Sequence, residues 1–163
     1  AIRGAYHFFP LFSYENRSVP FRERVIDAVL SSQNSWGAFE NEKCPAGACE
    51  DIDAVEPLVR FSRMTGYRRE EALLSARRSL VWVFSCRNAD GGYESSPENG
   101  CAYGGHPFTS SAPGESNLFA TWFRTLTIAY LADFTGLPNG YQVGRFPGYE
   151  ITLAAPSGGR PVR

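Results

Sequence analysis

Hydrophobic residues recur at helical spacing in four separate stretches of the chain. The first stretch opens at Pro20, which is tolerated in the first turn of a helix, and its apolar residues are Val25, Ile26, Val29 and Leu30. The other three helices are expected over residues 50–66, 69–86 and 115–135, and the last is apolar on nearly every side, which is typical of a buried helix. Because the sheet signal is negligible, the pattern predicts an all-α domain.

Glycine and proline mark where these helices end. Gly66 is a natural left-handed cap for the second helix, whereas Pro57 inside that helix predicts a late start or a kink. From Pro138 to Arg163, 9 of the 26 residues are Gly or Pro. We therefore expect a helical domain over residues 1–136 and an extended tail over residues 137–163.

Two copies of one unit are visible within the helical domain. The segments Gln33–Phe39 and Arg87–Tyr93 lie 54 residues apart and share Asn, Gly and an aromatic residue at matching places. Each segment ends one helix and is followed by a loop, an acidic residue and a second helix that closes with Thr-Gly. The unit is therefore helix, turn, loop, helix, and residues 1–12 are interpreted as the end of a preceding unit.

The first turn, Gln33-x3-Gly37-x-Phe39, resembles the QW-type repeat of squalene and hopene cyclases and protein prenyltransferases. The second copy departs from it, because Arg87 stands at the Gln position. The resemblance covers roughly residues 20–136 and implies an α/α toroid, a ring of helical hairpins around a central cavity. Two hairpins are only a partial ring. Since the chain starts at Ala1 without Met, we expect it to be the C-terminal part of a longer protein, with a second chain as the alternative source of the missing hairpins.

The strongest candidates for catalysis are three carboxylates in four residues, Glu50, Asp51 and Asp53. Repulsion and burial would raise the pKa of one of them and make it a proton donor. The cyclases that the chain resembles use a D-x-D-D acid to protonate an alkene or epoxide, and here Asp51-x-Asp53-Ala54 lacks the fourth residue. The alternative is that the acids cap a helix N-terminus and interact with its dipole.

The last helix supplies candidate binding residues. Phe119, Trp122 and Phe123 could line an aromatic cavity and stabilise carbocations through their rings, or simply form a core helix. Arg124 within so apolar a helix needs a partner, for which Asp51, Asp53 and an anionic diphosphate are the candidates.

The loop before that helix contains Tyr103 and His106. Both are candidate substrate-binding residues, and His106 could serve as a hydrogen-bond donor or a metal ligand, unless it is a solvated loop residue. Asp51-x-Asp53 with His106 is similar to the zinc layout of protein prenyltransferases, but Asp stands where the ligand Cys should be, so no metal site is predicted.

Composition narrows the function classes. The net charge of -1 argues against a nucleic-acid-binding protein, and the aromatic content of 14% fits a large core or an aromatic-lined cavity. No apolar run is long enough to span a membrane, and four cysteines without a stapled-domain pattern are expected to be free thiols of a cytoplasmic protein.

Three hypotheses follow. The first is acid-initiated cyclisation of a linear isoprenoid by Asp51 or Asp53, which requires no cofactor. The second is a non-catalytic toroid that binds an isoprenoid or a glycan. The third is a toroid similar to polysaccharide lyases, with His106 and Tyr103 as acid and base.

Overall fold

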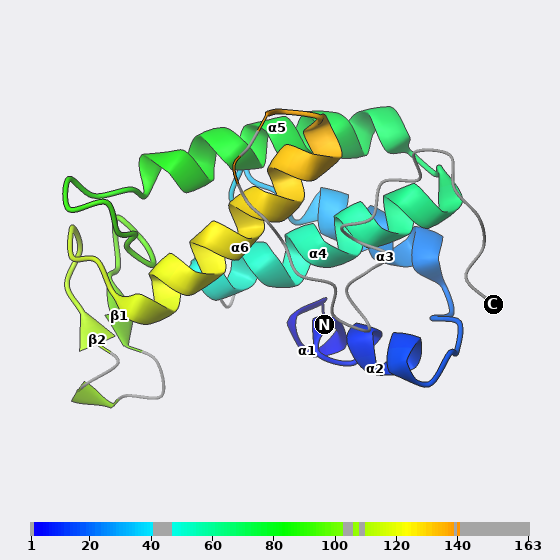
Figure 1. The fold of residues 1–163 in the computed structure, drawn as a ribbon, viewed down its shortest axis with the longest axis horizontal. Helices are drawn as coiled ribbons and strands as arrows, with labels where there is room; N and C mark the ends of the chain where they lie inside the picture. The colour runs from blue at the N-terminus through cyan, green and yellow to red at the C-terminus, as the bar shows by residue number, and fades with distance from the viewer. Residues whose placement is uncertain (1, 41–46, 103–105, 108–109, 139, 141–163) are drawn as a thin grey trace.

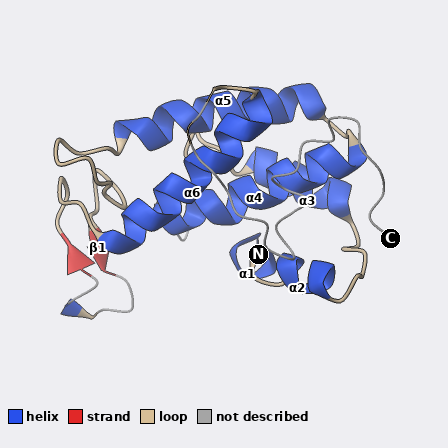
Figure 2. Cartoon of the chain, viewed as in Figure 1, coloured by secondary structure: helices blue, strands red, loops and turns tan. Residues whose placement is uncertain are grey.

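A computed structural model describes residues 2–40, 47–102, 106–107, 110–138 and 140. Within them lie six helices and one pair of very short antiparallel strands (Figure 2). The elements are α1 (Ile2–Tyr6), α2 (Phe9–Tyr14), α3 (Arg22–Ser31), α4 (Ala48–Thr65), α5 (Arg69–Ser85), β1 (Cys101–Ala102), β2 (Ser110–Ser111) and α6 (Leu118–Thr135). The predicted all-α class is confirmed.

The helix boundaries follow the local capping residues. Helix α6 begins at Leu118 because the side chain of Asn117 accepts a hydrogen bond from the backbone N–H of Ala120. Helix α4 begins at Ala48, earlier than the predicted start, after an extended Gly47. The late start suggested by Pro57 is therefore wrong, since this proline lies inside the helix.

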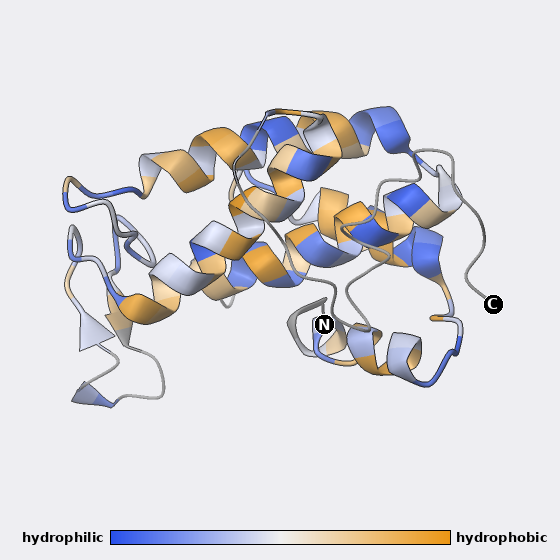
Figure 3. Cartoon of the chain, in the orientation of Figure 1, coloured by the Kyte–Doolittle hydropathy of each residue, from blue (hydrophilic) through white to orange (hydrophobic). Residues whose placement is uncertain are grey.

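The four long helices form two hairpins, α3–α4 and α5–α6, and α4 lies at the centre of the array (Figure 1). Helix α4 packs against α1, α3, α5 and α6, so every residue from 51 to 62 is buried. Buried side chains of α4 and α6 make the main part of the core. Polar and apolar segments alternate along α4, although it is the most enclosed helix (Figure 3).

The two predicted turns have the same backbone geometry. Gly37 and Gly91 adopt left-handed φ values of 94° and 88°, which favour glycine. In each turn the Asn N–H donates to the carbonyl four residues later, at 2.9 Å, and the first and last residues form an isolated β-bridge. The repeat detected in the sequence is therefore also a repeat of structure.

The second helices of the two units also correspond. Helices α4 and α6 each contain 18 residues and are related by a shift of 70 positions. Both end at a left-handed glycine, Gly66 or Gly136, and the Thr before it donates its hydroxyl to the carbonyl four residues earlier. The described residues thus form an array of two helical hairpins, and the closed toroid remains a prediction.

Candidate functional site

A buried ion pair joins the first turn of α4 to α6. Asp51 and Arg124 are both 0% exposed, and the Arg124 guanidinium contacts Asp51 Oδ2. The indole N–H of Trp82, from α5, donates to the same oxygen at 2.8 Å. The other carboxylate oxygen, Oδ1, accepts the backbone N–H of Phe39 at 3.1 Å. Both oxygens of Asp51 are therefore engaged within the protein.

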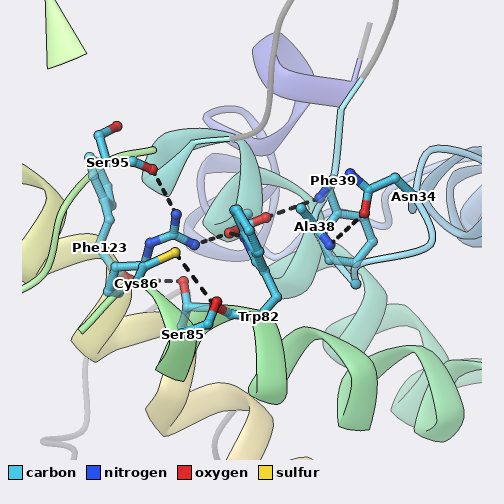
Figure 4. A network of polar contacts seen from close by, with 12 residues as sticks. Asn34, Ala38, Phe39, Trp82, Ser85, Cys86, Ser95 and Phe123 are labelled. Carbon is cyan, nitrogen blue, oxygen red and sulfur yellow. Dashed lines mark hydrogen bonds and ion pairs between the residues drawn. The ribbon is translucent and has the colours of Figure 1, made fainter. Parts of the chain in front are cut away.

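Arg124 extends the network to the segment that follows the second turn. Its Nη2 donates to the carbonyl of Ser95 at 2.7 Å, and the guanidinium carbon lies 5.5 Å from the centre of the Trp82 ring. Ser95 and Phe39 lie at opposite sides of the network in Figure 4. One guanidinium–carboxylate pair, held between α4, α5 and α6, thus links the first turn to the segment that follows the second turn. Of the partners considered for Arg124, Asp51 is confirmed.

The hydrogen bond between Asp51 and the first turn has a counterpart in the second unit. Asp51 is the fourth residue of α4, and Thr121 is the fourth residue of α6. The Oγ1 atom of Thr121 accepts the backbone N–H of Tyr93 at 3.0 Å, just as Asp51 accepts that of Phe39. A side-chain oxygen at this position therefore holds the aromatic residue of the turn in both units. What Asp51 adds is a charge, which pairs with Arg124.

Burial dominates the electrostatics of Asp51. Loss of solvation raises the pKa of this carboxyl group, and the positive charge of Arg124 together with the hydrogen bonds from Phe39, Trp82 and Arg124 opposes that rise. Among the groups that favour the ionised form of this carboxyl group, Arg124 has the largest effect.

The remaining acids of the cluster lie in different environments. Asp53 is 2% exposed, and the thiol of Cys49 lies 3.9 Å from its Oδ2 atom. Glu50 is half-buried in the first turn of α4. The N-cap of that helix is Gly47, so the prediction that these acids cap the helix is wrong for the N-cap position itself.

The aromatic candidates form a stack at the N-terminal end of α6. The Phe123 ring lies 4.5 Å from those of both Trp122 and Phe119, stacked on the first and edge-on to the second. Phe123 is buried, Phe119 is half-buried, and Trp122 is 60% exposed. The stack therefore begins in the core beside Arg124 and ends at the surface.

The other predicted residues lie outside this network. His106 is exposed between β1 and β2, where its backbone carbonyl accepts the hydroxyl of Ser110 at 3.0 Å. Tyr103 lies outside the described residues. Within the part of the chain that the structure describes, no group of three His, Cys, Asp or Glu side chains is placed to hold a metal ion.

The sequence singled out Phe39 only as the aromatic residue of the turn motif, and it did not place Trp82, Phe39 or Ser95 in this network. The only available signal was the indole N–H of Trp82 within an apolar helix, since a buried indole usually finds an acceptor. The contributions of Phe39 and Ser95 come from backbone atoms, which carry no sequence signal.

Three of the four cysteines, Cys49, Cys86 and Cys101, are free thiols in the structure, and Cys44 lies outside the described residues. Burial raises the pKa of Cys86 to about 11. Among the described helices, none combines the length and apolar character needed to cross a membrane.

Comparison of the chain with protein-family models, with curated proteins and with solved structures finds no match. The resemblance to terpenoid cyclases and prenyltransferases therefore rests on the turn motif and remains a prediction.

Proposed function

We propose that this chain is a helical-hairpin module that binds a linear isoprenoid against the aromatic end of α6. The observation that supports this most directly is the exposed stack on that helix. Trp122 is 60% exposed and Leu118, one turn earlier on the same face, is 87% exposed. Large apolar side chains grouped at the surface are typical of ligand or partner sites.

The buried network favours binding over acid catalysis by Asp51. A proton donor has to reach the reacting atom within hydrogen-bond distance, directly or through one water. Asp51 has no exposed surface, and both of its oxygens already accept hydrogen bonds from Phe39, Trp82 and Arg124. In this proposal the Asp51–Arg124 pair fixes the first turn of α4 against α6, and α6 presents the aromatic stack.

Titration of tryptophan fluorescence with farnesol tests the binding proposal. Trp122→Ala should weaken binding by about 10- to 100-fold, because covering a large apolar side chain contributes about 1.5–3 kcal/mol. Trp36→Ala is the matched control, since Trp36 is 76% exposed but lies on the first turn. The proposal fails if farnesol does not bind, or if the two variants weaken binding equally.

Acid-initiated cyclisation is the second candidate, with Asp53 as the donor. The observation in its favour is that Asp53 is nearly buried in α4 while remaining outside the Asp51–Arg124 pair. Linear C15 to C30 isoprenoids should then yield cyclic products with the wild type but not with Asp53→Asn. Wild-type protein that binds farnesol and converts none of these substrates would reject cyclisation and leave the binding proposal intact.

A further inference from the structure

The two units contact each other along a defined edge of the first one. Asp27 on α3 forms an ion pair with Arg68, the N-cap of α5, at 2.7 Å. In the following turn, the Gln33 side chain donates to the carbonyl of Ser75 at 2.9 Å. We call the side of a unit that faces the next unit its trailing edge.

Gly37 completes this contact. A Cβ atom at Gly37 would overlap the backbone carbonyl of Arg78, so the turn of the first unit lies directly against the α5 backbone. Only glycine allows that approach, because it has no side chain and tolerates the left-handed φ. The first trailing edge therefore contacts α5 at three places, through Asp27, Gln33 and Gly37.

Among the described residues, none covers the trailing edge of the second unit as α5 covers that of the first. A shift of 54 residues relates Asp27, Leu30, Gln33 and Gly37 to Val81, Phe84, Arg87 and Gly91.

Val81 is 72% exposed, Phe84 is 51% exposed, and Arg87 is exposed. A Cβ atom at Gly91 would meet only the Arg87 guanidinium, at 3.8 Å. This turn keeps the glycine of the first unit, although no backbone among the described residues approaches it. At the positions where the first unit has Asp27 and Leu30, the second unit has two apolar residues, Val81 and Phe84.

We call the opposite side of a unit, which faces the preceding unit, its leading edge. On α5, the turn of the first unit contacts the backbone carbonyls of Ser75 and Arg78. The shift of 54 residues relates these two positions to Phe21 and Arg24 of the first unit. Phe21 is 69% exposed, and the Arg24 guanidinium lies over its ring at 5.3 Å. Ala28, one turn further along α3, is exposed as well. The N-cap residue Phe21 and the adjoining side of α3 therefore present a small apolar surface around an aromatic ring.

We propose that the trailing edge of one copy of this chain binds the leading edge of a second copy, head to tail. The contact continues the α3–α5 interface that already joins the two units within the chain. Val81 and Phe84 would cover Phe21, and Arg87 would donate to a backbone carbonyl of the partner's α3, as Gln33 does to Ser75. A second copy is the occupant because the repeat relates its α3 to residues 76–85 of α5, the part that contains Arg78. Such a contact is heterologous, so it builds a ring or an open chain rather than a twofold dimer.

Sedimentation velocity over a range of protein concentrations tests this inference independently of any ligand. Wild-type protein should associate, whereas Val81→Glu and Phe21→Glu should each be monomeric, because each variant places a charge in an apolar contact. Trp36→Asp is the control: it changes an exposed aromatic residue into the residue that the second turn carries at the equivalent position, Asp90, and it should associate like the wild type. Far-UV circular dichroism verifies that every variant is folded, and Ala28→Glu serves as a second leading-edge variant.

A mixture of two variants distinguishes this contact from a symmetric one. Val81→Glu keeps an intact leading edge and Phe21→Glu keeps an intact trailing edge, so the mixture should form a one-to-one dimer and nothing larger. Wild-type protein that remains monomeric at all concentrations would overturn the inference, and the edge would then belong to another partner. Association that survives Val81→Glu, or a mixture that stays monomeric, would also overturn it.

Discussion

The buried pair between Asp51 and Arg124 gives the most direct test of how this fold is held together. Replacing Arg124 with Met keeps a long apolar side chain in α6 but leaves the Asp51 carboxylate buried without its counter-charge. Removing one partner of a buried ion pair costs about 3–5 kcal/mol. At about 2–4 °C per kcal/mol for a domain of this size, the unfolding temperature should fall by about 6–20 °C.

The repeat supplies the compensating change. Thr121 performs in the second unit the hydrogen bond that Asp51 makes in the first, without a charge. Asp51→Thr combined with Arg124→Met should therefore keep an acceptor for the Phe39 N–H and remove the unpaired charge. We expect the double variant to be more stable than Arg124→Met alone by about 2 kcal/mol or more, although the Trp82 indole loses its acceptor.

The deficit of Arg124→Met should also depend on pH. Without the guanidinium, burial raises the pKa of Asp51 further above its unfolded value. The folded state then binds more protons than the unfolded state between the two pKa values, so its stability falls as pH rises through that window. Urea unfolding followed by circular dichroism should thus show a smaller deficit near pH 5 than near pH 7. A pH-independent deficit, or a double variant less stable than the single one, would refute this reasoning.

Three further predictions concern the turns and the thiols. Gly37→Ala should destabilise the protein more than Gly91→Ala in urea unfolding. Each variant places alanine at a left-handed φ, which costs about 1–2 kcal/mol, but only the alanine at position 37 also overlaps the Arg78 backbone. Equal losses of stability would contradict the close approach of the first turn to α5. Gln33→Leu should cost about 1–3 kcal/mol in the same assay, because it removes the hydrogen bonds that this side chain donates to the carbonyls of Gly37 and Ser75, and an unchanged urea midpoint would contradict this. Cys86 should react with a thiol reagent at pH 8 only on unfolding, because it is buried and its pKa is about 11, and modification of Cys86 in folded protein would count against its burial.

Much of the secondary structure was determined by local sequence. Gly66 ends α4, and the two turns of the repeat adopt matching conformations. These features depend on φ preferences and on side-chain hydrogen bonds that span only a few residues. A single sequence is enough to predict them for that reason.

The local sequence predicted the start of α4 only approximately. The acids at positions 50–53 suggested a helix N-terminus there, but the helix begins at Ala48 after Gly47. Acidic residues are favourable throughout the first turn, so their presence places a helix start only to within a few residues.

Only the tertiary structure decided which acid pairs with Arg124. Asp51 and Asp53 were equivalent candidates in the sequence, and 73 residues separate Asp51 from Arg124. Two positions along a helix differ by about 200° in direction, so only one of the two acids can face α6. Which one does so depends on how the α3–α4 and α5–α6 hairpins pack, and the packing places Asp51 between Arg124 and Trp82. The charge that the sequence offered as a proton donor thereby became the buried link between the two hairpins.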